Sequence, residues 1–175
     1  MIYLLNGQQT ERLIFRNVSL NDFNEWIAFF KDPETSRHWE SEKEDPGTEC
    51  RKWYERQLQR YADKEGGMNA LVEKISGKLV GHCGLLKQEV DGIDEVEIAW
   101  SLLPAFWNKG YATEAAMQCR NYAFENDLSA SLISIISLTN RPSEKVALKV
   151  GMHLDKTTIY KHNAVNILRI INTNT

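Results

Sequence analysis

The chain has 175 residues, of which 42% are hydrophobic and 26% are charged, and its formal net charge is −3. This length and composition are typical of one globular domain, residues 1–175, that can bury a full core without disulfides or metals. The small negative charge gives no electrostatic case for nucleic acid or an anionic membrane as a partner, and no apolar run is long enough to span a bilayer.

The first third of the chain predicts one strand followed by two helices. Residues 12–18 alternate as a strand does, and Ser19 is typical of a helix cap. The helix after it has one apolar face, which consists of Leu20, Phe23, Trp26, Ile27 and Phe30. A polar, acidic loop over 34–47 leads to a second helix from about Thr48. The glycines at 66–67 are expected to end this helical segment.

A meander of strands is predicted in the middle of the chain, at 70–75, 79–86 and 95–103. Tight turns at 76–77 and 91–92 join them. Gly81 and Gly84 interrupt the second strand and indicate bulges or close approaches of neighbouring backbone.

The last third predicts alternating helices and strands. The expected elements are a helix at 112–125, a strand at 131–138, a short helix between Pro142 and Gly151, and two strands within 152–171. The complete order is β-α-α-β-β-β-α-β-α-β-β. It predicts an α+β (mixed α/β) domain with a central, mostly antiparallel mixed sheet of about seven strands and helices on both faces.

The segment 102–116 is a candidate ligand site. An apolar run stops at Pro104, Gly110 follows in an aromatic turn, and small apolar residues recur at helical spacing from Ala112. Glycine permits close approach of a ligand, and the first turn of a helix offers unpaired N–H groups with partial positive charge. Local features leave two interpretations open: a phosphate-binding loop, or a structural loop before a core helix.

Three cysteines, at positions 50, 83 and 119, lie far apart and form no C-x-x-C pair. They predict neither a disulfide framework nor a zinc site. They favour a reducing compartment, and we expect a cytoplasmic protein.

The order of elements and the segment Leu-Leu-Pro-Ala-Phe-Trp-Asn-Lys-Gly-Tyr-Ala-Thr-Glu-Ala at 102–115 resemble the GCN5-related N-acetyltransferases (GNAT), and most closely the branch of ribosomal-protein-alanine N-acetyltransferases. Further matching pieces are 10–16, 97–100, Asn140, Ser143 and 151–152. The resemblance implies an enzyme that transfers the acetyl group of acetyl-CoA, without a metal, by direct attack of a primary amine in a ternary complex. The acceptor would be a protein N-terminus or a small-molecule amine, and the enzyme a monomer or homodimer.

The resemblance also implies where acetyl-CoA binds. Its pyrophosphate would lie on the backbone amides of Trp107, Asn108, Lys109, Gly110, Tyr111, Ala112 and Thr113. The pantetheine arm would lie along the strand that ends at Leu102 and Leu103, where two parallel strands splay apart. Asn140 would point its amide at the pantetheine or at an active-site water, and Ser143 would lie near the thiol.

Glu97 is the candidate general base. An amine must be neutral to attack a thioester, and a nearby carboxylate can accept its proton. The alternative role of Glu97 is to pair with a basic side chain on the next strand, whereas Glu95, at the strand start, is expected to be solvated. Many relatives carry a Tyr near Leu148 that protonates the leaving thiolate. This chain lacks it, which leaves the general acid unidentified.

Candidates for acceptor contacts are His38, Trp39 and Trp100. The loop with His38 and Trp39 covers the acceptor site in this family, although Trp39 can equally fill the edge of the core. Two other functions stay open. One is a non-catalytic acyl-CoA sensor or interaction protein on the same scaffold. The other, a different class of nucleotide-binding module, is disfavoured by the absence of a G-x-G-x-x-G or P-loop motif.

Overall fold

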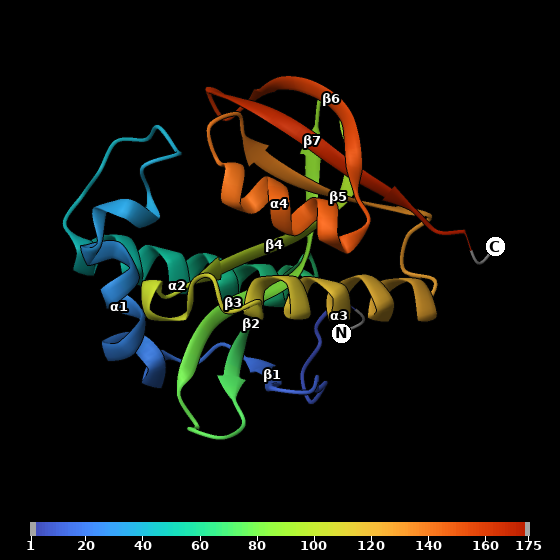
Figure 1. Cartoon of the computed structure of the whole chain (residues 1–175). Helices are drawn as coiled ribbons and strands as arrows, with labels where there is room; N and C mark the ends of the chain where they lie inside the picture. Colours follow the sequence, from blue (N-terminus) through green and yellow to red (C-terminus); the bar gives the residue numbers. More distant parts are fainter. Residues whose placement is uncertain (1–2, 174–175) are drawn as a thin grey trace.

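A seven-stranded sheet forms the centre of the molecule over the residues that the structure describes, 3–173 (Figure 1). In this computed structural model the strands are β1 (Leu13–Asn17), β2 (Gly66–Glu73), β3 (Leu79–Val90), β4 (Ile93–Leu102), β5 (Ser131–Ser137), β6 (His153–Tyr160) and β7 (Asn163–Ile171). They lie in the order β1-β2-β3-β4-β5-β7-β6. Neighbouring strands are antiparallel except β4 and β5, which are parallel. The predicted mixed, mostly antiparallel sheet is confirmed.

Helices cover both faces of the sheet, as predicted. They are α1 (Phe23–Lys31), α2 (Pro46–Asp63), α3 (Tyr111–Glu125) and α4 (Arg141–Val150), with short 3-10 turns η1 (Leu20–Asp22), η2 (Pro33–Thr35) and η3 (Pro104–Phe106). α1 and α2 pack together against β2 and β3, and α3 and α4 cover β3, β4 and β5 from the other side (Figure 1). Within residues 3–173, no helix is both long enough and apolar enough to cross a membrane.

The glycines at 66–67 begin β2 and do not end the helical segment, which corrects the expectation from the sequence. α2 stops before them, with Lys64 as a left-handed cap at φ 60°. β2 and β3 approach closely here: an added Cβ on Gly66 would lie 2.1 Å from the Leu85 carbonyl oxygen, and one on Gly84 would lie 2.1 Å from the Gly67 carbonyl oxygen. Gly81 is similarly crowded by the β4 backbone, so the close approaches expected at Gly81 and Gly84 are confirmed.

β4 and β5 separate almost as soon as they meet. β4 pairs with β3 along its whole length, and β5 pairs with β7 along its whole length. Between β4 and β5, Glu97 and Ile133 are the one register pair among the described residues. The two strands therefore open beyond this pair, and the crossover through α3 starts at the open end.

A buried aromatic cluster lies between α1, α2 and β3. His82 is 0% exposed, and its ring centroid lies 4.2 Å from that of Trp26 and 4.4 Å from that of Trp53. Within residues 3–173, neither His82 ring nitrogen has a hydrogen-bond partner. Burial therefore lowers the pKa of His82 well below its usual value.

This burial predicts a pH-dependent stability. Because the folded state binds a proton at His82 less readily than the unfolded state, the contribution of His82 is complete above about pH 6.5 and is lost as the pH falls below that value. Between pH 7.5 and 5.5, His82→Phe should lose less unfolding free energy than the wild type, by up to about 1.4 kcal/mol. Urea titrations at both pH values measure this difference.

The control is His153→Phe, which replaces an exposed histidine of β6 and should keep the wild-type pH dependence. Equal losses in His82→Phe and the wild type would contradict the assignment of a buried, neutral His82.

Candidate functional site

The loop from β4 to α3 presents the start of a helix without a side-chain cap. Trp107 fixes the loop, because its indole Nε1 donates to the Leu102 carbonyl at 2.8 Å. Asn108 and Gly110 take left-handed conformations, with φ of 58° and 82°, and turn the chain into α3. No side chain caps the first amides of α3, so these groups are available to an anion.

A partly buried ion pair anchors this loop to the start of β1. Glu114, in the first turn of α3, accepts from the Thr10 hydroxyl at 2.6 Å, the Arg12 backbone amide at 2.9 Å and Arg12 Nε at 2.6 Å. The Arg12 guanidinium also donates to the Lys109 carbonyl at 2.9 Å and lies 4.2 Å from the centre of the Tyr111 ring. The helix start is therefore held in place before any ligand binds.

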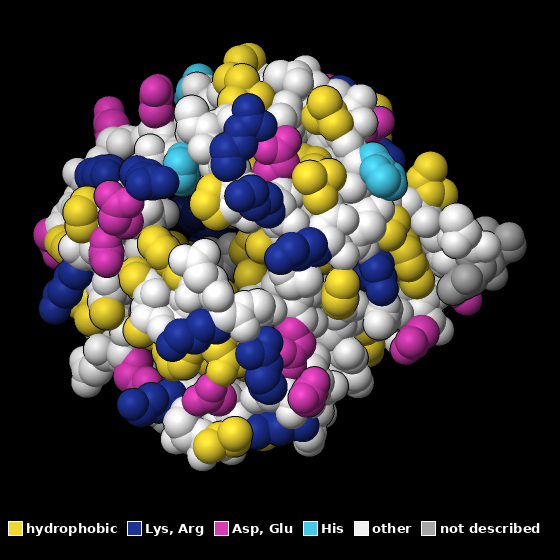
Figure 2. Space-filling view, viewed as in Figure 1, with side chains coloured by type: hydrophobic (Ala, Val, Ile, Leu, Met, Phe, Trp, Pro, Cys, Tyr) yellow, Lys and Arg dark blue, Asp and Glu magenta, His cyan; other side chains and the backbone are white. Residues whose placement is uncertain are grey.

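A cavity of about 660 Å³ opens beside this loop (Figure 2). Most of the residues implied to bind the cofactor line it: Leu102, Trp107, Asn108, Gly110, Tyr111, Ala112, Thr113, Asn140 and Ser143. Basic side chains lie around the hollow in Figure 2, and those of the lining are Arg37, Lys145 and Lys149. Arg37 pairs with Glu34 of the same lining, so the positive charge comes from Lys145 and Lys149. Together with the free helix amides, this charge suits a ligand with several phosphate groups.

Leu103 and Lys109 do not line this cavity. Leu103 packs against the aromatic cluster between α1, α2 and the sheet. Lys109 turns its ammonium group to the Ala105 carbonyl, 2.8 Å away. Both residues contribute to the shape of the loop.

A smaller cavity of about 150 Å³ lies where β4 and β5 part. Residues that line both cavities are Thr35, His38, Trp100, Asn140 and Ser143. The rest of its lining is Trp39, Glu97, Ile98, Ala99, Ser134, Ile135, Ile136 and Ser137. Because the cavities share lining residues, ligands in the two cavities would meet at this junction.

Glu97 is the one acidic side chain among the described residues that line the smaller cavity. It is 8% exposed, and its carboxylate accepts from Gln88 Nε2 at 2.7 Å and from the Ile135 backbone amide. Burial raises the pKa of Glu97 above its usual value, although both donors act in the opposite direction. A cleft carboxyl with a raised pKa is suited to proton transfer.

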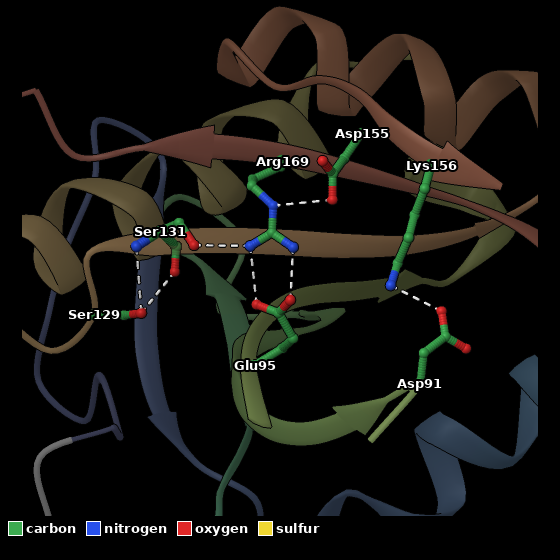
Figure 3. A network of polar contacts seen from close by, with 7 residues as sticks. All are labelled: Asp91, Glu95, Ser129, Ser131, Asp155, Lys156 and Arg169. Atoms are coloured by element: carbon green, nitrogen blue, oxygen red, sulfur yellow. Dashed lines mark hydrogen bonds and ion pairs between the residues drawn. The ribbon is translucent and has the colours of Figure 1, made fainter. Parts of the chain in front are cut away.

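Glu95 is paired and nearly buried, which corrects the expectation that it is solvated. Arg169 of β7 donates to both of its carboxylate oxygens, at 2.9 and 2.6 Å (Figure 3). The same guanidinium donates to Ser131 at 2.8 Å and to Asp155 at 3.1 Å. The long Arg169 side chain crosses β5 to reach β4, so this network ties the three strands together two residues before the Glu97–Ile133 pair. Within residues 3–173, Glu95 and not Glu97 pairs with a cation of a nearby strand.

The candidate acceptor residues surround the smaller cavity. His38 Nδ1 lies 2.9 Å from the Thr139 hydroxyl, which joins the loop before α2 to the end of β5. Trp39 packs against Tyr160 with ring centroids 6.4 Å apart, so it lines the cavity and covers the edge of a core cluster at once. Trp100 faces both cavities from β4.

Asn140 and Ser143 lie at the junction of the cavities, at the start of α4. The Asn140 side-chain oxygen accepts from the Ser143 amide at 3.2 Å, which caps the helix. Both residues line the two cavities. Leu148 is 52% exposed and lies outside the lining of both cavities.

Several residues of the site escaped the sequence analysis. Lys145 and Lys149 are four residues apart on α4, and this spacing was a usable signal for one basic helix face. Arg12 and Glu114 are 102 residues apart, and no local pattern indicates their contact. Within residues 3–173, no group of three His, Cys, Asp or Glu side chains could hold a metal ion.

A family model and a curated relative match most of this chain. The family model "Acetyltransferase (GNAT) domain" matches residues 12–153. The uncharacterized protein YkkB of Bacillus subtilis is 30% identical over 131 residues, which are 73% of this chain and 73% of that protein.

Several solved structures of acetyltransferases share the fold of this chain. An acetyltransferase from Agrobacterium tumefaciens superposes with a TM-score of 0.80 at 24% identity, over 97% of this chain and 96% of that chain. Spermidine N-acetyltransferase from Vibrio cholerae, in complex with CoA and spermine, gives 0.73 at 13% identity, over 93% and 96%. The ribosomal-protein-S5-alanine acetyltransferase from Vibrio fischeri shares the fold as well, with a TM-score of 0.70 at 16% identity, over 95% of this chain and 97% of that chain.

The position of Gly110 gives a direct test of the larger cavity. Gly110→Trp should abolish CoA binding, because Gly110 lines the larger cavity and an added Cβ would lie 3.4 Å from Arg12 Nη2, so the indole would crowd both the cavity and the ion pair that holds the start of α3. Isothermal titration of CoA into the purified variant measures this loss.

Gly77→Trp is the matched control. Gly77 also has a positive φ, 69°, so the backbone strain is similar, but it lies in the β2–β3 turn, where an added Cβ would meet nothing within 4 Å. Gly77→Trp should bind CoA like the wild type. Retained binding in Gly110→Trp would show that the ligand lies elsewhere.

Proposed function

Since the chain belongs to the GNAT acetyltransferase family and acetyl-CoA is therefore its donor, we propose that it acetylates a single primary amine that enters the smaller cavity. One observation carries this proposal: the two cavities meet at the parting of β4 and β5, with Glu97 on the smaller side. A thioester delivered from one side and an amine from the other would come together there, and proximity of this kind supplies much of the rate.

The larger cavity fits the donor. Free amides at the start of α3, with Lys145 and Lys149 opposite, match the phosphates of CoA. The open β4 edge that leads to Glu97 can take the amide groups of the pantetheine arm as an additional strand would.

In the proposed reaction the neutral amine nitrogen forms a bond to the acetyl carbonyl carbon and the carbon–sulfur bond breaks. Glu97 accepts the proton that the amine loses, directly or through one water. The sulfur leaves as the thiolate of CoA and takes a proton from solvent. Ser143 would donate a hydrogen bond to this sulfur and Asn140 would hold the pantetheine, since both residues line the two cavities.

The smaller cavity favours an acceptor with one amine. Its volume is about 150 Å³, and Glu97 is the one carboxylate among its described lining residues. A polyamine would leave its further ammonium groups without an acidic partner there. An α-amino group has a pKa of about 7.7–8.0 against about 10.4 for lysine, so a weak carboxylate base serves the α-amine better. We therefore favour the α-amine of a short peptide or protein N-terminus over lysine or spermidine.

A panel of acceptors tests this proposal. Saturation with acetyl-CoA at about 100 times its Kd should stabilise the protein by about 2.7 kcal/mol. Thiol release should then be fastest with N-terminal peptides and slow with spermidine or Nα-blocked lysine. Thermal stabilisation without turnover on any amine would instead support an acyl-CoA sensor.

Glu97→Gln should lower kcat by about 10²- to 10⁴-fold, the usual contribution of a general base, with little change in acetyl-CoA binding. It should also remove the part of the rise of kcat/KM with pH that deprotonation of Glu97 gives the wild type, because the glutamine does not titrate, and keep the part that comes from deprotonation of the acceptor amine. Thiol-release assays from pH 5 to 9 measure both effects.

Glu95→Gln is the control, since Glu95 lies two residues earlier on β4, pairs with Arg169 and lines neither cavity. It should keep the pH dependence of the wild type. An unchanged kcat and pH profile in Glu97→Gln would remove Glu97 as the base.

A further inference from the structure

The first missing rung between β4 and β5 is replaced by two side chains. In a parallel ladder, the rung after Glu97 and Ile133 would join the Ile135 amide to the Ile98 carbonyl. Instead, the Ser134 hydroxyl donates to the Ile98 carbonyl at 2.8 Å. The Ile135 amide donates to the Glu97 carboxylate. Each backbone group is satisfied, but by the side chain of the facing strand.

This exchange occurs in the buried wall of the smaller cavity. Ser134 is 1% exposed and Ile98 is 0% exposed. A buried carbonyl or amide without a partner is costly, so the strands can stay apart at this depth only if other groups take up the two bonds. Ser134 and Glu97 meet that need, and both line the smaller cavity.

We propose that Ser134 is a positioning residue that, together with Glu97, sets the point at which β4 and β5 part and so holds the acetyl-CoA cleft open. This inference rests on the proposed function. Without the Ser134 hydroxyl, the Ile98 carbonyl would be left to the Ile135 amide, its partner in the next rung of the ladder. The strands would then close by one rung and withdraw this amide from Glu97.

Charged and titratable groups from several elements face Glu97. They are Arg60 of α2, Tyr160 of β6, Lys161 of the β6–β7 turn and His38 of the loop before α2. Arg60 and Tyr160 both donate to the Gln88 side-chain oxygen, so they act on Glu97 through Gln88. A change at Ser134 leaves all of these groups in place, and its effect on Glu97 is thus confined to the Ile135 amide.

Ser134→Ala tests the inference. We expect the Kd for acetyl-CoA to rise by about tenfold, because part of its binding free energy must break the hydrogen bond from the Ile135 amide to the Ile98 carbonyl. The acidic limb of kcat/KM should move to higher pH by about half a unit or more, because the Glu97 carboxylate loses one donor. The thermal midpoint should stay equal or rise, since a backbone rung replaces the side-chain bond.

Ser134→Thr, which keeps the hydroxyl, should restore the wild-type Kd and pH profile. Thr157→Ala, which removes an exposed hydroxyl on β6, controls for the loss of a hydroxyl elsewhere. A Ser134→Ala variant with a lowered thermal midpoint but unchanged Kd and pH profile would overturn the inference and leave the proposed function intact. Failure of the wild type to bind acetyl-CoA would instead overturn the proposed function.

Discussion

The site depends on one constraint, which is that β4 and β5 share a single rung of their parallel ladder and then separate. A sheet that closed at this point would have no gap for an extended ligand arm and no route from the loop before α3 to Glu97. The outer neighbours stabilise the separated strands, because β4 pairs with β3 and β5 pairs with β7 along their whole lengths. Each strand keeps one satisfied edge and offers the other to a ligand.

The two ends of this gap are fixed by different means. Before the Glu97–Ile133 pair, the Arg169 network with Glu95 bridges the strands. At the open end, Arg12 and Glu114 hold the first turn of α3 against β1. The part of the site suited to phosphate thus consists of a helix start and an ion pair between residues distant in the sequence. The part suited to acetyl transfer consists of strand edges, and the two parts meet at the junction of the cavities.

Residues that end strands and start helices, together with local hydrophobic patterns, made most of the fold predictable. Pro104 and Gly110 marked the end of β4 and the start of α3, and the order of helices and strands indicated the mixed sheet. The family resemblance was correct as well. Contacts between distant segments were not predictable in the same way. The sequence predicts a solvated Glu95 because its partner, Arg169, lies 74 positions away on a strand whose position in the sheet is not encoded locally.

A crystal structure with an uncleavable acetyl-CoA analogue would test most directly whether the parted strands form the site of acetyl transfer. The arrangement predicts pyrophosphate on the amides at the start of α3, pantetheine between β4 and β5, and the acetyl group at the junction beside Asn140 and Ser143, facing Glu97. A ligand bound outside the gap, or an acetyl group directed away from the smaller cavity, would contradict it.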